Sequence, residues 1–377
     1  MHHTFNIPIS VSWTRLKDEA AFRDASLRYT ITDAPGGQPV TRGRLLAAPD
    51  IDLSHYTFKA GIDWLAVRVS FPSERSWREV RATINPVVKE PGKGGVFVYG
   101  PDWEENYTGE EFIIRMNDPT RDRVNRMWLA LWSKVRPPHK LVPQHRVVAL
   151  EVFVDIFPKK RNGDTDRDLW ARRAMMSDLL RKHVIFDRSW LKDEAFGEKD
   201  DWPRFVASYE KSNTEKPLTK TQHLIRARQG PPPALSKRMD ELCWWARDAK
   251  HHIEVPLNAT MYFGGEHRPL MIRLQDKVQD LRKVETAIDL KPEQRRSRIE
   301  VQMKNTPELN ILGGEGIETI DDLRTYKFKR LRKAIFAFQM PTLEKTAEGG
   351  PTEAEVEIMK LTGSLGLPPP TRQLGLR

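Results

Sequence analysis

Two carboxylates four residues apart on one predicted strand are the first residues in this chain that could act together chemically. Glu151 lies in the middle of the run 147–155 and Asp155 ends it, and an even spacing on a strand puts both side chains on the same face. Glu300, in the run 297–303, could join them from a second strand. Three converging carboxylates repel one another unless a cation neutralises them, and Mg²⁺ or Mn²⁺ prefers such oxygen ligands. The spacing therefore predicts a divalent metal site at these three residues.

The same carboxylates also have a purely structural explanation. Charges at a sheet edge need only an ion-pair partner, and Arg298 or Lys159 could supply it. Both explanations remain open at this point.

Three short segments carry charges inside apolar runs, which is typical of strands that bury one face and present charges on the other. The exposed charges would be Arg273, Lys277 or Glu300. The segments are Thr260–Gly265, Met271–Lys277 and Ser297–Met303.

A basic cluster lies in a predicted C-terminal helix over 320–338. Lys and Arg bind nucleic acid chiefly through phosphate, so this cluster predicts salt-dependent affinity with little sequence preference. A solvated basic face is the alternative. The cluster consists of Lys327, Lys329, Arg330, Arg332 and Lys333.

Composition supports a polyanionic partner. The chain has 377 residues, with 62 Lys plus Arg against 52 Asp plus Glu, a formal charge of +10 and a sequence pI near 9.5. The lone Cys243 excludes an internal disulfide and a cysteine-based zinc site. No apolar run approaches the ~18 residues of a membrane span, and the first residues lack the apolar centre of a signal peptide. We therefore expect a cytoplasmic protein without membrane contacts.

The order of strands and helices predicts an α+β fold, in which an antiparallel sheet has helices packed on one side. A second strand set, with a helix over Val278–Val284, suggests a duplicated core domain, and a helical extension follows it. The predicted parts are a β-rich N-terminal extension (1–55), the first half of the core (56–186), a charged, Pro-rich connection with short helices (187–250), the second half of the core (251–310), and the basic helix with a partly disordered tail (311–377).

These segments together resemble the replication initiator family of rolling-circle plasmids and filamentous phages, and the related relaxases. The family pattern is roughly Thr-x-Tyr-Phe-Gly, Ile-Arg-x-Tyr-Asp-Lys and Arg-x-Glu, and this chain has Thr260-Met-Tyr-Phe-Gly, Ile272-Arg-Leu-Gln-Asp-Lys and Arg298-Ile-Glu. The run 61–71 is similar to the family's opening strand, and 147–155 to its Arg-x-Asp-x-x-x-Asp strand. The four segments occur in the family's order over about residues 60 to 305.

The resemblance implies a DNA-binding initiator that acts at the origin of a plasmid, phage or integrative element, with Arg273 among the residues that bind the DNA. Such a protein nicks and rejoins single-stranded or hairpin origin DNA through a tyrosine and Mg²⁺ or Mn²⁺, and the cation polarises the scissile phosphate. The tyrosine keeps the 5′ end and leaves a free 3′ hydroxyl. A host helicase or polymerase would be a further partner.

The chain departs from the family pattern at two places. Gln275 stands where the family has tyrosine, while Ala149 and Glu151 stand where it has Arg and Asp. An amide cannot attack phosphorus, so nicking must use another tyrosine or does not occur. Tyr262, the nearest tyrosine to the proposed site, is the candidate nucleophile, and a cation such as Lys277 would stabilise its phenolate. A tyrosine that only packs on its strand is the structural alternative.

Gln275 also supports a rival function, a non-catalytic DNA-binding replication or regulatory protein derived from that family. A structural or packaging protein would explain the charge, but it would not explain four ordered motifs. The sequence leaves the oligomeric state open.

Overall fold

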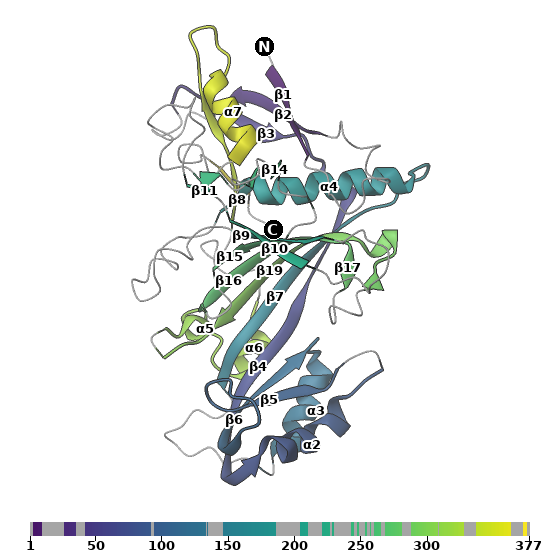
Figure 1. The fold of residues 1–377 in the computed structure, drawn as a ribbon, viewed down its shortest axis with the longest axis vertical. Coiled ribbons are helices and arrows are strands. Elements are labelled where there is room, and N and C mark those ends of the chain that lie inside the picture. Colours follow the sequence, from purple (N-terminus) through teal and green to yellow (C-terminus); the bar gives the residue numbers. More distant parts are fainter. Residues whose placement is uncertain are drawn as a thin grey trace.

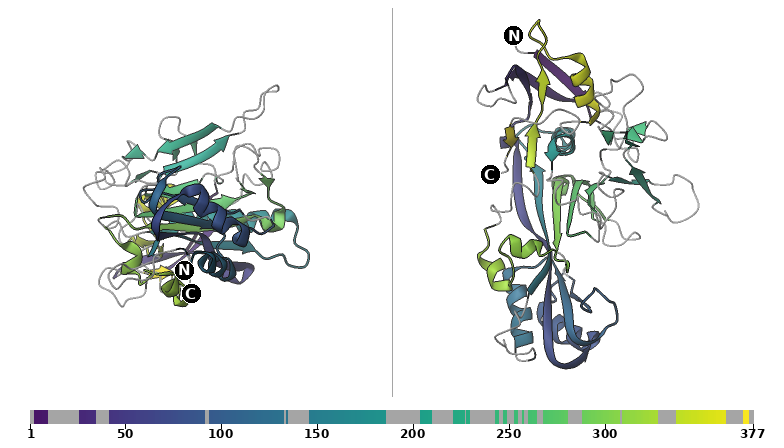
Figure 2. Two further views of the ribbon diagram at one scale, coloured as in Figure 1. Left: turned by 90° about the horizontal axis from the view of Figure 1, so that it is seen from below. Right: turned by 90° about the vertical axis from the view of Figure 1, so that its left-hand side faces the viewer.

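The computed structural model describes most of the chain (Figure 1). The described residues are 3–9, 26–34, 42–91, 94–132, 134, 146–185, 204–209, 221–226, 228–229, 243–244, 247–248, 253–254, 257, 260–264, 268–280, 288–307, 309–327, 337–362 and 372–374. The molecule is elongated, with a small N-terminal sheet at one end and helices α2 and α3 at the other (Figure 1 and Figure 2). Along the described part of the chain, no helix is long and apolar enough to cross a membrane.

A nine-stranded sheet forms the centre of the molecule, and every neighbouring pair in it is antiparallel. Its strand order is β10-β9-β15-β16-β19-β7-β4-β6-β5. Its strands are β4 (Tyr56–Ser76), β5 (Val96–Tyr99), β6 (Thr108–Asn117), β7 (Arg146–Pro158), β9 (Arg204–Tyr209), β10 (Thr221–Arg226), β15 (Thr260–Phe263), β16 (Leu270–Lys277) and β19 (Arg296–Lys304).

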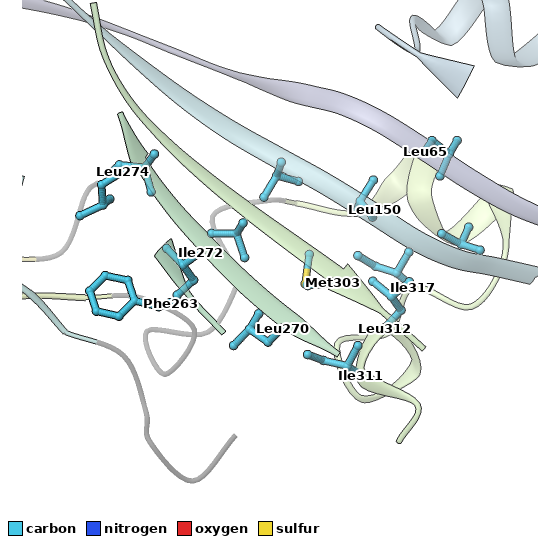
Figure 3. Packing of buried hydrophobic residues seen from close by; sticks show 14 of the residues in the cluster. Leu65, Leu150, Phe263, Leu270, Ile272, Leu274, Met303, Ile311, Leu312 and Ile317 are labelled. Atoms are coloured by element: carbon cyan, nitrogen blue, oxygen red, sulfur yellow. The ribbon is translucent and has the colours of Figure 1, made fainter. Parts of the chain in front are cut away.

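One face of this sheet, the apolar face, packs against the helices. Its alternate residues are buried aliphatic and aromatic side chains, such as Leu150, Ile272 and Met303 (Figure 3). The helices that contribute to this core are α2 (Trp77–Val88), α3 (Arg121–Trp132), α4 (Asp166–His183), α5 (Ile311–Gly314) and α6 (Ile320–Thr325). The predicted α+β fold with an antiparallel sheet is therefore confirmed.

A local sequence signal explains where α2 begins, and polar contacts position α4. Ser76 and Glu79 make a reciprocal capping box at the start of α2, which satisfies two amide groups that the helix leaves without partners. On α4, Arg173 forms a buried ion pair with Asp276 of β16 (2.7 Å), and Ser177 donates to the same carboxylate. These polar contacts fix α4 across the apolar face of the sheet.

The N-terminal strands form a second, four-stranded sheet of order β1-β2-β3-β21, so a C-terminal strand completes the predicted β-rich extension. Helix α7 lies beside this sheet (Figure 1). The elements are β1 (His3–Pro8), β2 (Ser26–Asp33), β3 (Arg44–Pro49), β21 (Thr342–Glu344) and α7 (Glu353–Thr362). The remaining short elements are η4 (Leu53–His55), η10 (Pro292–Gln294), β8 (Val184–Ile185), β11 (Arg228–Gln229), β12 (Cys243–Trp244), β13 (Arg247–Asp248), β14 (Ile253–Glu254), β17 (Gln279–Asp280), β18 (Ile288–Asp289), β20 (Ala337–Met340) and β22 (Arg372–Leu374).

Three sequence-based expectations differ from the structure. In the connection 187–250, the described residues form strands rather than short helices, and two of these strands extend the large sheet. In the helix expected over Val278–Val284, residues 279–280 form β17. The basic helix is correct over 320–325, but Tyr326 and Lys327 are not helical and 337–338 belong to β20; its middle lies outside the described residues. The local sequence at these positions favoured helices, but pairing with neighbouring strands determined the observed structure.

The suggested duplication is not visible in the described connectivity. Going outward from the central pair, the first half uses β7, β4, β6 and β5, while the second half uses β19, β16, β15 and β9. In the first half, the strand beside the central strand is β4, which comes first of the four along the chain. In the second half the corresponding strand is β16, which comes third of the four. The two halves share one sheet without repeating each other's strand order.

Candidate functional site

The face of the nine-stranded sheet opposite the helices is the charged face, defined by Tyr262, Arg273, Glu300, Glu151 and Arg298. Antiparallel pairing puts directly opposed residues on the same face. Tyr262 opposes Arg273, and Arg273 opposes Glu300. The register thus brings residues from β15, β16 and β19 into one row.

Three carboxylates on this face form the carboxylate cluster, which consists of Asp63, Glu151 and Glu300. Each offers an oxygen atom, and these oxygens lie within 4.8 Å of one another. They come from β4, β7 and β19, three neighbouring strands of the sheet. Glu151 and Glu300 belong to the predicted set, but Asp63 occupies the place expected for Asp155.

A β-bulge explains why sequence spacing missed Asp63. In the pairing of β4 with β7, Ile62 opposes Val152 and Trp64 opposes Glu151, so Asp63 is an extra residue in β4. A second irregularity of opposite sense follows, where Val148 is the extra residue in β7. Bulges redirect side chains and are common beside functional sites. The one available signal was a single charge inside the apolar run 62–67.

Two arginines form ion pairs with the carboxylate cluster. Arg273 contacts Glu151 (Nη2–Oε1, 2.5 Å) and Glu300 (Nε–Oε2, 2.7 Å). Arg298 contacts Glu300 (Nη1–Oε1, 3.0 Å) and Asp63 (Nη1–Oδ1, 3.3 Å). Each guanidinium bridges two carboxylates, which offsets part of the repulsion among the three acidic groups.

Asp155 takes part in a separate ion pair. Arg298 donates to it through Nε (2.5 Å) and Nη2 (2.9 Å), and Arg296 Nε lies 2.9 Å from the same carboxylate. Of the two structural partners expected from the sequence, Arg298 is correct, while Lys159 donates to the carbonyl of Ser54 instead (2.9 Å). Asp155 therefore shares Arg298 with the carboxylate cluster but does not belong to it.

Burial perturbs the ionisation of Glu151. Its side chain is 1% exposed, and desolvation raises its pKa from 4.5 to about 7, opposed by the charge of Arg273 and reinforced by that of Glu300. Its Oε2 atom is buried and has no hydrogen-bond partner within the described part of the chain. Glu151 is thus harder to ionise than a solvated glutamate, and one of its buried oxygens has no hydrogen-bond partner in the described residues.

Arg298 is held by an aromatic ring as well as by carboxylates. Its guanidinium lies 4.1 Å from the ring centroid of Phe153, a cation–π contact. That ring in turn covers Gly61, where a Cβ atom would approach it to 2.7 Å. Although burial opposes its charge, hydrogen bonds and charges from its carboxylate partners raise the pKa of Arg298. The site keeps a fixed positive charge at this point.

The predicted catalytic residues lie at different distances from the cluster. Tyr262 is half-buried and next to Arg273 across the strand pair. Gln275 donates from Nε2 to Glu300 (3.1 Å). Lys277 lies at the far end of β16, four residues and about 14 Å along the strand from Arg273. Among the predicted site residues, Arg273, predicted to bind DNA, is therefore the cation nearest to Tyr262.

The predicted basic cluster is only partly described. Lys327 is exposed just after α6, while Lys329, Arg330, Arg332 and Lys333 lie outside the described residues. Their role in DNA binding remains a prediction from the sequence.

Comparisons with known proteins include a distant structural similarity. The chain is similar to the rolling circle replication initiator protein from Geobacillus stearothermophilus, with a TM-score of 0.30, 12% sequence identity, and coverage of 82% of this chain and 98% of that one. No family model matches the sequence, and no curated protein matches it. The similarity to a replication initiator is weak and lies at the level of the fold.

Proposed function

We propose that this protein binds origin DNA and cleaves and rejoins one strand through Tyr262 at the carboxylate cluster. The supporting observation is the row on the charged face, in which Arg273 contacts both Glu151 and Glu300 and opposes Tyr262. A potential nucleophile, a cation and three carboxylates therefore share one rigid surface. The family resemblance of the four sequence segments points to the same chemistry.

The carboxylate cluster fits a divalent cation. Asp63, Glu151 and Glu300 present oxygens within 4.8 Å of one another, and the buried Oε2 of Glu151 has no hydrogen-bond partner in the described residues. Oxygen ligands of this kind suit Mg²⁺ or Mn²⁺, which would polarise the scissile phosphate when bound. Binding of the cation would require Arg273 and Arg298 to give up part of their contact with the carboxylates. Cation binding and these arginine contacts would therefore be coupled.

The reaction itself would use the protein's own side chains. The Tyr262 hydroxyl loses its proton to solvent, and Arg273 stabilises the phenolate electrostatically. The phenolate oxygen forms a bond to phosphorus while the bond from phosphorus to the 3′ oxygen breaks, and that oxygen takes up a proton. The 5′ end stays on Tyr262. Reversal of the same steps rejoins the strand, because the covalent bond conserves the phosphodiester energy.

One observation favours a non-catalytic DNA-binding protein as the second candidate. Gln275 occupies the position at which the family resemblance expects tyrosine, and it donates to Glu300. Arg273 and Arg298 also already form ion pairs with the carboxylates. In this alternative the charged face keeps its ion pairs for stability and the nucleophile has been lost.

A covalent-adduct assay separates the two candidates. The protein is incubated with Mn²⁺ and end-labelled DNA hairpins with randomised loops, and a denaturing gel reveals any protein-DNA adduct. We expect an adduct with the wild type, its loss in Tyr262→Phe, and its retention in the control Tyr107→Phe, a tyrosine that packs on Phe112. An adduct that persists in Tyr262→Phe would refute Tyr262 as nucleophile.

Two further results have distinct meanings. DNA binding without any adduct would favour the non-catalytic protein, and in that case Gln275→Tyr tests whether a phenol beside Glu300 restores cleavage. Absence of DNA binding would refute both candidates.

A further inference from the structure

The charged face carries a second feature, a cavity of about 920 Å³ at the ends of β5, β6, β7 and β19. This aromatic cavity, named for Tyr99 and Trp103 in its wall, adjoins the carboxylate cluster. Trp64, which opposes Glu151 across the β4–β7 pair, meets Trp103 edge to face at a centroid distance of 6.5 Å. The cavity lies within the range of about 300–1,000 Å³ that is usual for ligand sites.

Aromatic and cationic side chains are interleaved in the cavity wall. The rings of Tyr99 and Trp103 are 5.6 Å apart, and Lys304 Nζ lies 5.2 Å from the centroid of Trp103. Arg68 and Arg146 add two guanidinium groups. Aromatic rings next to cationic groups can bind a nucleotide, because bases stack on aromatic surfaces and phosphates bind Lys and Arg.

The backbone holds Trp103 in an uncommon conformation. Its φ is +66°, in the left-handed region that bulky residues rarely adopt. Hydrogen bonds from Trp103 N to Gly100 O (3.1 Å) and from Gly100 N to Glu104 O (2.9 Å) close the turn. At Gly100 a Cβ atom would meet the Tyr107 ring at 2.7 Å, so the turn depends on glycine. The fold therefore fixes this ring at the cavity rather than packing it in the core.

The charges of the wall favour an anionic ligand. The wall contains three cationic residues and two acidic ones. The cationic residues are Arg68, Arg146 and Lys304, and the acidic residues are Asp102 and Glu318. Arg68 donates from Nη2 to the carbonyl of Pro101 (3.3 Å), and its Nε is buried with no hydrogen-bond partner in the described residues. An apolar ligand would leave this donor unpaired, whereas a phosphate oxygen would satisfy it.

We propose that the aromatic cavity binds one unstacked nucleotide of single-stranded DNA, several nucleotides along the strand from the position that is cleaved. The base lies against Tyr99 and Trp103, and the adjoining phosphates contact Arg68, Arg146 and Lys304. This inference rests on the proposed function, because it assumes that the strand which reaches Tyr262 continues along the charged face. The cavity positions that strand without taking part in the chemistry.

The test measures binding separately from cleavage. Fluorescence anisotropy with a labelled oligothymidylate of about 15 nucleotides, in EDTA, gives the Kd. Trp103→Leu keeps an apolar side chain but removes the stacking surface, so we expect affinity to fall by about 5- to 100-fold. Trp103→Phe should restore most of it. Trp132→Leu, at a 61% exposed position on α3, is the control and should bind as the wild type does.

Salt dependence gives a second measurement that does not depend on Trp103. Lys304→Gln should lower the slope of log Kd against log salt by about 0.7, the value for one phosphate contact in single strands. Trp103→Leu should leave that slope unchanged. Thermal unfolding of each variant checks that the fold is intact.

Three outcomes would overturn the inference. If the wild type binds the oligonucleotide but Trp103→Leu and Lys304→Gln both bind equally well, the cavity is not a DNA subsite, while the proposed function stands. If free dTMP competes at the concentration of the oligonucleotide, the cavity takes a free nucleotide instead. If the wild type does not bind single-stranded DNA at all, the proposed function fails as well.

Discussion

Replacing Glu151 with glutamine should stabilise the protein at alkaline pH and leave it nearly unchanged at acidic pH. Glu151 is buried, and burial raises its pKa from 4.5 to about 7. Between these values the folded protein keeps the proton that the unfolded chain has lost. The free energy of unfolding of the wild type therefore falls as pH rises through this window. Glutamine matches the protonated acid in shape but never ionises.

The expected magnitude follows from that pKa difference. One pH unit corresponds to about 1.36 kcal/mol, so the rise from 4.5 to about 7 amounts to about 3 kcal/mol at about pH 8. At about pH 5 most of this difference disappears, because the wild-type side chain is then protonated in the folded state, and less than about 1 kcal/mol remains. For a chain of 377 residues, 3 kcal/mol corresponds to about 4 °C in Tm.

Urea unfolding followed by tryptophan fluorescence at about pH 5 and about pH 8 measures both values. Glu105→Gln, at an exposed position, is the matched control and should change stability little at either pH. An equal effect of Glu151→Gln at both pH values would refute the reasoning, since it would show that the Glu151 carboxyl titrates alike in the folded and unfolded protein.

Comparison of the wild type with Glu151→Gln also tests the proposed cation site. Metal ligands must be deprotonated, so Mn²⁺ should stabilise the wild type more at about pH 8 than at about pH 6. Glu151→Gln should abolish most of this stabilisation. Equal stabilisation of wild type and variant would place the ion elsewhere.

Two further predictions concern the basic cluster and the packing beneath the ion pairs. Charge reversal at Lys329 and Arg332 should weaken binding to all DNA sequences and flatten its salt dependence, as measured by anisotropy across a salt series; unchanged binding would identify a solvated face. Gly61→Ala should destabilise the protein by about 1–3 kcal/mol, because the new Cβ would meet the Phe153 ring at 2.7 Å. Gly314→Ala, where nothing lies within 4 Å, should be neutral in the same urea titration, and equal effects of both would exclude the steric explanation.

Hydrophobic alternation was sufficient to predict much of the large sheet. The apolar runs at 62–71, 147–157 and 271–277 became neighbouring or near-neighbouring strands, and even spacing placed Glu151 and Asp155 on the same face. Period-two patterning determines which face a side chain occupies, because a shift by one residue reverses every side chain. Which charges share a face was therefore predictable from the sequence.

Which of those charges meet was not predictable from spacing alone. Glu151 and Asp155 share a face, but four residues separate them by about 14 Å along the strand. The third carboxylate of the cluster is Asp63, whose position depends on a bulge that leaves no periodic signal. The pairing of β7 with β19 likewise decides that Arg298 opposes Asp155. The register between strands that lie far apart in the sequence decides which charges meet.

The two irregularities between β4 and β7 cancel each other. Asp63 adds one residue to β4 and Val148 adds one to β7, so the pairing is out of step only between them and resumes its original alignment beyond. Deleting both residues together would leave an uninterrupted ladder with every other side chain on its present face. Such a shortened protein would keep the architecture while losing one carboxylate of the cluster and one wall residue of the aromatic cavity. Asp63 and Val148, the two extra residues that interrupt the β4–β7 ladder, are thus residues that shape the two candidate sites.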